Sequence, residues 1–283
     1  MLTTRVIPVL HVKGPNLVKG VHLEGLRVLG RPEVFARHYY EQGADELVFL
    51  DIVASLYGRN NLHEIVQRVA DQVFIPLTVG GGVRCVQDAL QLLRSGADKV
   101  AVNTAAVRRP QLLRELAEVI GCQAVVLYVE AKDRGGWWEC LTDNAREPAG
   151  REVLGWVQEA VALGAGEILL CSVDRDGTGL GYDLALTRQV SEAVSVPVIA
   201  LGGASRPEHC LQGLREGRAD AAAAASLFHY AVARQLNTGV DEQEGNTEFL
   251  EGRRGSHGGP WEGGLVQVKE ALAKLGVSVR AGT

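Results

Sequence analysis

The sequence lacks the features that would place the chain in a membrane or in a secretion pathway. No apolar run approaches the roughly 18 residues that a membrane-spanning helix needs, and the mean hydropathy is close to zero. The opening segment MLTTRVIPVL has no long apolar stretch before a small-residue cleavage site, so we expect no secretory signal. We therefore expect a cytoplasmic globular protein that does not contact a membrane.

An excess of basic charge and closely spaced cysteines are also missing. The 29 basic and 34 acidic residues are interspersed, so the sequence shows no basic face for nucleic acid. The five cysteines are odd in number and widely scattered, without the spacing of a zinc or redox site. We expect reduced thiols, no metal and no cofactor. Aromatic residues make up only 5% of the chain, which fits a core of Val, Leu, Ile and Ala.

What the sequence does contain is a regular alternation of apolar runs and helix-period segments. The segments place apolar residues at i, i+3 and i+4, and several of them end at glycine. Eight β-then-α units predict an α/β fold, a closed (β/α)8 TIM barrel with its function at the C-terminal ends of the strands. The runs are continuous, as in parallel strands buried on both faces, and cover residues 6–12, 46–52, 75–80, 99–103, 124–130, 167–173, 196–202 and 219–225.

The second half of the chain repeats the first. GADELVFLDI, which begins at Gly43, returns as GAGEILLCSV from Gly164, 121 positions later, and IPLTVGGGV returns as VPVIALGGA at the same spacing. A long self-match at a fixed offset is a specific signal of internal duplication. We therefore predict a single barrel domain over residues 1–283, built from two half-barrels of about residues 1–120 and 121–283.

Glycine pairs follow the third and seventh expected strands at equivalent places in the repeat. Glycine lets the backbone approach a ligand closely, and successive N–H groups at a following helix bind phosphate. One such feature could be merely a turn, but two related by the repeat predict a substrate with a phosphate at each end. The expected phosphate-binding residues are Gly81, Gly82, Asn103 and Thr104 in the first half, and Gly177, Gly202, Gly203, Ala225 and Ser226 in the second.

Charged residues mark both ends of the expected barrel. Asp176, in SVDRDGTG after the sixth strand, could contact a ligand hydroxyl or cap the loop as an Asx-turn; the density of charge around it favours a functional role. Four further charges stand where strands begin and could be ordinary surface charge. Because charges leading into buried strands are costly unless paired, they could instead close the barrel floor as a neutral ring of Arg5, Glu46, Lys99 and Glu167.

The motifs resemble those of the cyclase subunits of imidazole glycerol phosphate synthase, from histidine biosynthesis. The resemblance runs from Arg5 to about Tyr230 and resumes at LVQVKEALAKLGVSVR; it rests on LVFLDI, LTVGGGV, DKVAVNTAAV, GAGEIL, SVDRDGTGLGYD and SLFHY. It implies a subunit that takes ammonia from a glutaminase partner and needs no metal or redox cofactor. The implied substrate is a phosphoribulosyl formimino carboxamide ribotide, which yields imidazole glycerol phosphate and aminoimidazole carboxamide ribotide.

The resemblance also assigns residues, and the chain departs from it at the acid/base positions. The family places one Asp at the end of strand one and another at the end of strand five; this sequence has His11 and Glu130 there. The repeat supports the equivalence of the two positions, which lie 119 residues apart. Lys19, a substrate-loop residue of the family, is kept, whereas Cys171 and Leu201 stand where the family usually has Thr and Ser. The expected catalytic residues are His11, Glu130, Lys19 and Asp176.

At the other end of the barrel, the resemblance implies a route for ammonia. Arg5, Glu46, Lys99 and Glu167 match the ring that gates ammonia in the family, and Asp98 and Gln123 match positions near the partner. It therefore implies a heterodimer with a glutaminase (glutamine amidotransferase) subunit.

Two segments fall outside the barrel pattern. Between Val240 and Gly264 the sequence is rich in glycine and charge and has no apolar periodicity, which predicts a disordered insertion after strand eight. A tolerated surface loop is the commoner outcome for such a segment, although Phe249, Arg253, Arg254 and Trp261 could form a lid. The pair Trp137 and Trp138, after strand five, favours a packing hairpin over a stacking platform.

Three functions remain open on the sequence. The first is a working cyclase subunit that uses Glu130 and His11. The second is a divergent paralogue that amidates a different phosphorylated substrate. The third is a non-catalytic barrel scaffold that binds a phosphorylated ligand and regulates a glutaminase.

Overall fold

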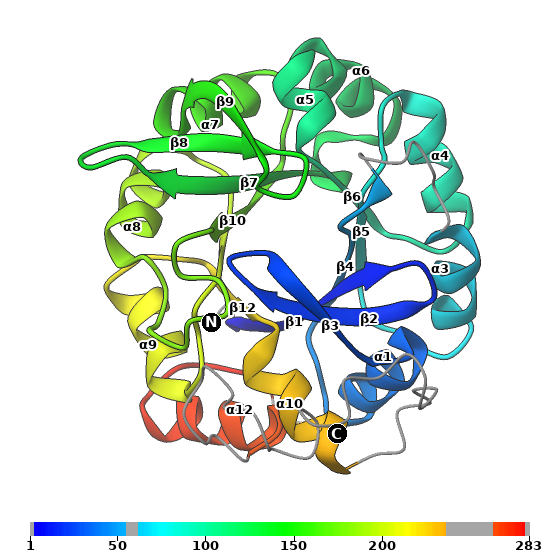
Figure 1. Cartoon of the computed structure of the whole chain (residues 1–283), viewed down its shortest axis with the longest axis vertical. Helices are drawn as coiled ribbons and strands as arrows, with labels where there is room; N and C mark the ends of the chain where they lie inside the picture. Colours follow the sequence, from blue (N-terminus) through cyan, green and yellow to red (C-terminus); the bar gives the residue numbers. More distant parts are fainter. Residues whose placement is uncertain (1–2, 55–61, 236–262, 281–283) are drawn as a thin grey trace.

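The structure, a computed structural model, describes residues 3–54, 62–235 and 263–280. Its centre is a closed barrel of eight parallel strands, in which the last strand pairs with the first (Figure 1). The predicted TIM-barrel fold is therefore confirmed. In order around the barrel, the strands are β1 (Arg5–Lys13), β4 (Leu47–Asp51), β5 (Leu77–Gly80), β6 (Lys99–Val102), β7 (Val125–Asp133), β10 (Glu167–Ser172), β11 (Val198–Leu201) and β12 (Ala221–Ala224).

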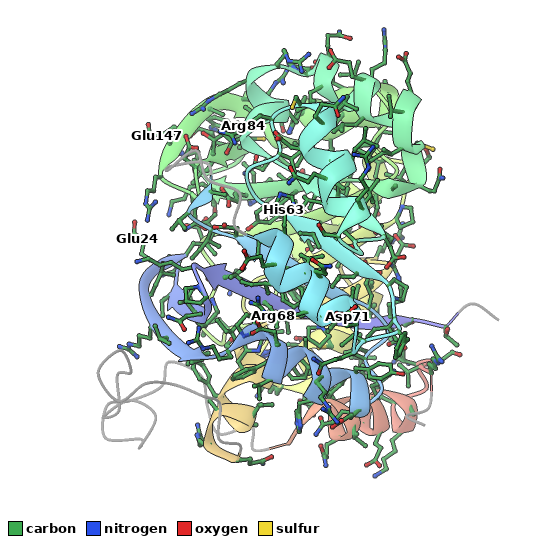
Figure 2. The ribbon with its side chains drawn as sticks, turned by 90° about the vertical axis from the view of Figure 1, so that its right-hand side faces the viewer. Glu24, His63, Arg68, Asp71, Arg84 and Glu147 are labelled. Atoms are coloured by element: carbon green, nitrogen blue, oxygen red, sulfur yellow. The ribbon has the colours of Figure 1, made fainter. Side chains whose placement is uncertain are left out.

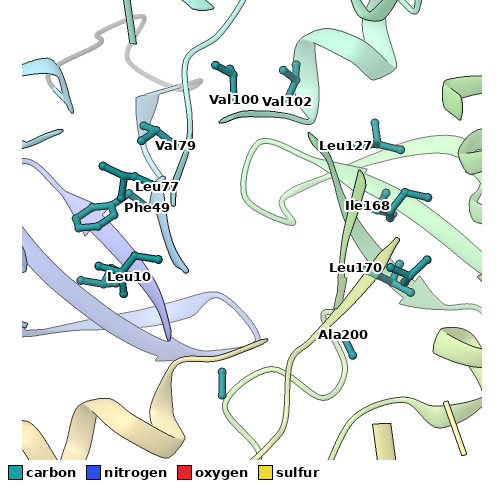
Figure 3. Packing of buried hydrophobic residues seen from close by; sticks show 14 of the residues in the cluster. Leu10, Phe49, Leu77, Val79, Val100, Val102, Leu127, Ile168, Leu170 and Ala200 are labelled. Atoms are coloured by element: carbon teal, nitrogen blue, oxygen red, sulfur yellow. The ribbon is translucent and has the colours of Figure 1, made fainter. Parts of the chain in front are cut away.

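Helices surround the barrel and bury the outward faces of its strands. Figure 3 shows the apolar side chains Leu10, Phe49, Val79 and Leu170 pointing away from the barrel centre toward these helices. None of the helices in the described part of the chain is long and apolar enough to cross a membrane. The helices are α1 (Pro32–Glu41), α3 (Leu62–Ala70), α4 (Val86–Arg94), α5 (Thr104–Arg108), α6 (Gln111–Ile120), the 3-10 turn η1 (Cys122–Ala124), α7 (Val153–Ala162), α8 (Leu184–Ala193), α9 (Pro207–Arg215), α10 (Ser226–Gln235) and α12 (Leu265–Lys274).

Two antiparallel hairpins extend the barrel sheet at equivalent places in the two halves. One is formed by β2 (Asn16–Val21) and β3 (Glu24–Gly30), the other by β8 (Trp138–Thr142) and β9 (Glu147–Glu152). The hairpin expected around the tryptophan pair is confirmed, and Trp138 donates a hydrogen bond to Asp183 at 3.0 Å. The β2–β3 hairpin was not predicted, and placing Lys19 in a loop was wrong because Lys19 lies within β2.

The insertion expected at about residues 240–264, with its possible lid residues Phe249, Arg253, Arg254 and Trp261, lies outside the described residues apart from Gly263 and Gly264. The chain is described again at α12, which packs beside α9. A buried ion pair fixes α12 to the barrel, because Lys269 Nζ lies 2.8 Å from a carboxylate oxygen of Asp45. Lys269 also donates to the backbone oxygen of Gly43, and Asp45 accepts from the backbone N–H of Val6 at the start of β1.

We expect Lys269→Met to lower the free energy of unfolding by about 3 kcal/mol, because it leaves the buried Asp45 carboxylate without its cation. Urea unfolding at neutral pH measures the change. Lys274→Met removes an exposed lysine from the same helix and should change stability by no more than about 0.5 kcal/mol. Equal effects from the two substitutions would contradict the anchoring role of the pair.

Candidate active site

The two expected acid/base residues face each other across the mouth of the barrel. His11 lies near the C-terminal end of β1 and Glu130 near that of β7, the first and fifth of the eight barrel strands (Figure 1). Side chains alternate along a strand; because Ile7 and Val9 lie inside the barrel, His11 does too, and Val126 places Glu130 there in the same way. Both residues are buried, with exposed fractions of 1% and 2%.

Glu130 is a buried carboxyl group without a cation beside it in the described contacts. It accepts a hydrogen bond from the backbone N–H of Ala145 at 2.8 Å. Burial raises the pKa of Glu130 to about 7, against the opposing effect of that hydrogen bond. Near neutral pH both protonation states are therefore populated, which is the condition for a group that both accepts and donates a proton.

His11 sits in a different electrostatic setting. Burial, together with the nearby Lys19 ammonium, lowers the pKa of His11 to about 4, and Asp176 only partly opposes this. The imidazole is therefore neutral at physiological pH. Its Nε2 atom is buried without a hydrogen-bond partner among the described residues, so this nitrogen is available to a ligand in the mouth.

Lys19 and Asp176 form a buried ion pair beside His11. Lys19 Nζ lies 2.8 Å from a carboxylate oxygen of Asp176, and both side chains are almost completely buried. Burial alone would raise the pKa of Asp176, but Lys19, with smaller effects of His11 and of the hydrogen bond from Leu23, holds this pKa below its usual range. The structure thus brings together three of the four expected catalytic residues and places Glu130 on the opposite wall.

This ion pair belongs to a wider set of contacts that holds the β2–β3 hairpin over the second half of the mouth. Leu23, in the hairpin turn, packs with Leu141 and Val173, and its backbone N–H donates to Asp176. Gly177 lies directly under the hairpin, since a Cβ at this position would stand 2.6 Å from the backbone oxygen of Gly20. Of the expected phosphate-binding residues, Gly177 is therefore covered.

We call the expected phosphate-binding residues of the first half the first glycine cradle, and those of the second half the second glycine cradle. The two cradles have the same local geometry at their glycines. Gly81 and Gly202 have φ values of +110° and +98°, a region that side chains rarely adopt. A Cβ on Gly81 would meet the backbone oxygen of Asp51 at 2.5 Å, and a Cβ on Gly202 would meet that of Ser172 at 2.7 Å. Asp51 and Ser172 are themselves 121 positions apart, so the repeat extends to individual contacts and requires glycine at both places.

The first cradle opens into a cavity of about 280 Å³. Gly81, Gly82, Asn103 and Thr104 line it, and Glu130 lies in the same lining. Asn103 donates to the backbone oxygen of Leu141, and the Thr104 hydroxyl accepts from the N–H of Asp143, so β8 and the turn after it support this cradle.

The second cradle is built into the other half of the mouth. The backbone oxygen of Gly203 accepts a hydrogen bond from the N–H of Gly181 at 2.9 Å. Ala225 is buried directly after β12, and Ser226 is the first residue of α10. None of the expected second-half phosphate residues is among the residues described as lining the 280 Å³ cavity.

The four charges at the floor form a closed ring. Arg5 lies 2.8 Å from Glu46 and 2.6 Å from Glu167, while Lys99 lies 3.2 Å from Glu46 and 2.8 Å from Glu167. Each carboxylate is therefore paired with both cations, and Thr78 adds a hydrogen bond to Glu46 at 2.6 Å.

The two expected partner-interface residues, Asp98 and Gln123, are exposed on this floor. Asp98 also has a structural contact that sequence reasoning missed, because its carboxylate accepts from the N–H of Leu77 at 2.8 Å. Asp220 makes the equivalent contact to Val198 in the second half.

Several cavity residues were not singled out from the sequence. Tyr128 stands two positions before Glu130 on the same inward face, so strand alternation alone could have identified it. Three more come soon after the cradle motifs in the chain, but their sequence is typical of ordinary surface positions: Arg84, Arg108 and Arg109.

Comparison with known proteins agrees with this geometry. Residues 5–234 match the family described as histidine biosynthesis protein. The chain is 58% identical over 209 residues to "Imidazole glycerol phosphate synthase subunit HisF" of Legionella pneumophila, covering 74% of this chain and 99% of that protein. It is 53% identical over 232 residues to the protein of the same name from Myxococcus xanthus (strain DK1622), covering 82% of this chain and 92% of that protein. The chain therefore belongs to the histidine biosynthesis protein family, together with these HisF subunits of imidazole glycerol phosphate synthase.

Proposed function

We propose that this chain is the cyclase subunit of a glutamine-dependent imidazole glycerol phosphate synthase. It would take ammonia from a glutaminase subunit in a heterodimer and convert a formimino ribotide with a phosphate at each end into imidazole glycerol phosphate and aminoimidazole carboxamide ribotide. The observation that carries the proposal is the position of Glu130, a buried carboxyl with a pKa of about 7 that lies at the barrel mouth in the same cavity as a glycine cradle.

The interior of the barrel supports ammonia transfer from the floor to the mouth. Between the charged ring and Glu130 the inward side chains are mainly apolar and include the small residues Ala101, Ala221 and Ala223. Such a lining accepts neutral ammonia and opposes the ammonium ion, because burial of an unpaired charge is costly. If Lys99 moved aside, Glu46 and Glu167 would each keep a pair with Arg5, so opening at Lys99 would leave no carboxylate unpaired.

The same floor would receive the glutaminase. Asp98 and Gln123 stand exposed at the starts of β6 and β7, beside Lys99 of the ring. A partner bound there would release ammonia at the ring without exposing it to solvent.

At the mouth, we assign different tasks to the two acid/base positions. Glu130 exchanges protons with the substrate, since both of its protonation states are populated near pH 7. His11 acts as a neutral hydrogen-bonding group through its unpartnered Nε2 atom. Burial is the main cause of this neutral state; the Lys19 ammonium adds to it by disfavouring a second positive charge on His11, and Asp176 partly opposes it.

One observation favours a second candidate function, the amidation of a different phosphorylated substrate. A neutral imidazole stands where the family places a second carboxylate, so the side chain at position 11 cannot supply the negative charge that a carboxylate would. A substrate whose cationic intermediate needs only one carboxylate would be accommodated by Glu130 alone.

The proposal is tested by turnover of the formimino ribotide with ammonium salt and no partner. We expect formation of both products, with a rate that rises with the concentration of neutral ammonia. Complementation of a histidine auxotroph lacking the cyclase, on ammonium-rich medium, should restore growth. Growth with His11→Asp/Glu130→Asp but none with the unaltered chain would reject the cyclase assignment and favour the second candidate or a scaffold that regulates a glutaminase.

Glu130→Gln should lower turnover by a factor of about 10² to 10⁴, the usual contribution of general acid–base catalysis. If Glu130 is the base, kcat/KM of the unaltered chain should rise with pH through about 7. Glu147→Gln removes an exposed acid near the mouth (Figure 2) and should change neither quantity. A pH profile of the unaltered chain that is flat between pH 6 and 8 would contradict the assignment.

The same substitution has a predicted signature in stability. The pKa of Glu130 is raised from 4.5 to about 7 in the folded chain, so its protonated form favours folding. This contribution is fully present below about pH 4.5 and is lost as the pH rises through 7. Glu130→Gln should therefore gain stability relative to the unaltered chain over this window, by up to about 3 kcal/mol. Urea unfolding at several pH values measures the difference, and a constant difference would contradict the raised pKa.

A further inference from the structure

Three arginine side chains line the outer end of the first-half cavity, beyond the glycine cradle. We call this set, Arg84, Arg108 and Arg109, the arginine rim. Arg84 follows β5 and the cradle glycines, Arg108 is the last residue of α5, and Arg109 comes directly after it. Figure 2 shows Arg84 on the same side of the molecule as Glu24 and Glu147, which belong to the hairpins at the mouth. The side chains are about half exposed, at 51%, 64% and 49%.

Each arginine of the rim has a carboxylate partner, and these partners stand outside the cavity. Arg108 pairs with Asp143 at 2.6 Å, Arg109 pairs with Glu115, and Arg84 lies 3.9 Å from Asp88. None of these three acids is among the residues described as lining the cavity, although all three arginines are. These carboxylates therefore pair with the guanidinium groups without lining the cavity themselves. A guanidinium has five N–H donors, and Asp143 engages one from Arg108 while Glu115 engages two from Arg109.

The charge inside the cavity is consequently uneven. Of the acids in its lining, Glu130 lies at the inner end and Asp51 stands beside Gly81, and burial raises the pKa of both. Positive charge is gathered at the outer end, next to the cradle of Gly81, Gly82 and Thr104. The wall between the two ends is largely apolar and includes Leu50, Ile52 and Val83.

We propose that the first glycine cradle and the arginine rim together form a binding site for a diphosphate group. The first phosphoryl group lies on the backbone N–H groups of the cradle, and the second accepts hydrogen bonds from the guanidinium groups, whose planar donors match phosphate oxygens. The organic part of a diphosphate ester then runs along the apolar wall toward Glu130. The inference rests on the proposed function only in taking the cradle as a phosphate site.

The test uses the full chain, with inorganic phosphate and inorganic pyrophosphate titrated separately by calorimetry at low ionic strength. We expect pyrophosphate to bind about tenfold more tightly than phosphate, the equivalent of one additional charge-assisted hydrogen bond. In Arg108→Gln/Arg109→Gln this advantage should disappear, while the affinity for phosphate changes by no more than about threefold.

The matched control is Arg188→Gln/Arg218→Gln. Those two arginines are also about half exposed and both pair with an acid, Glu192, on the outer surface at α8. The control removes the same net charge, so it should keep the pyrophosphate advantage. Equal loss in both double variants would show a general charge effect and overturn the inference.

The remaining outcomes separate this inference from the proposed function. Phosphate that binds as tightly as pyrophosphate to the unaltered chain would overturn the diphosphate site and leave the cradle intact. Absence of binding by either anion would overturn both the cradle and the diphosphate site. If Arg108→Gln/Arg109→Gln keeps a native melting curve and still binds pyrophosphate more tightly than phosphate, the arginine rim does not bind the second phosphoryl group.

Discussion

In a closed parallel barrel, each strand must turn alternate side chains toward an interior that has no access to bulk water. Because of this constraint, the type of inward-facing side chain changes along the barrel axis from the floor to the mouth. Outward positions such as Leu10 and Phe49 bury against the helices. Inward positions begin at charged residues of the floor, continue through apolar residues, and end at ionisable residues of the mouth. Every polar group in the interior must therefore find a partner within the barrel or change its protonation state.

The floor and the mouth meet this requirement in different ways. At the floor, two carboxylates and two cations neutralise one another, and each carboxylate has both cations as partners. At the mouth, Lys19 is paired with Asp176, and no other described residue gives His11 or Glu130 a partner of opposite charge at contact distance. Burial then drives each toward its neutral form, which lowers the pKa of the imidazole and raises that of the carboxyl. The free-energy cost of burying an unpaired charge thus accounts for the paired ring at the floor and for the shifted pKa values at the mouth.

The sequence was sufficient for features that depend on local pattern and on the repeat. Continuous apolar runs located the eight barrel strands to within three residues, and charges at strand starts placed Arg5 and Glu46 on one floor. The β2–β3 hairpin could not be predicted in this way, because its position depends on the contact of Lys19 with Asp176, 157 residues away. The second role of Asp98 depends on the register between β5 and β6. The arginine rim depends on side-chain directions that the sequence does not specify.

The internal repeat gives the chain two cradles of almost equal geometry, yet the β2–β3 hairpin makes them unequal. Its contacts reach across the mouth to Val173, Asp176 and Gly177, all in the second half, whereas the first cradle opens into a cavity. A molecule with a phosphate at each end thus meets a first cradle that opens into the cavity and a second cradle whose Gly177 lies under the hairpin. The two ends of such a molecule therefore meet different surroundings in the two halves of the mouth. The repeat gives the two cradles a similar backbone geometry, and the contacts of a single hairpin distinguish them.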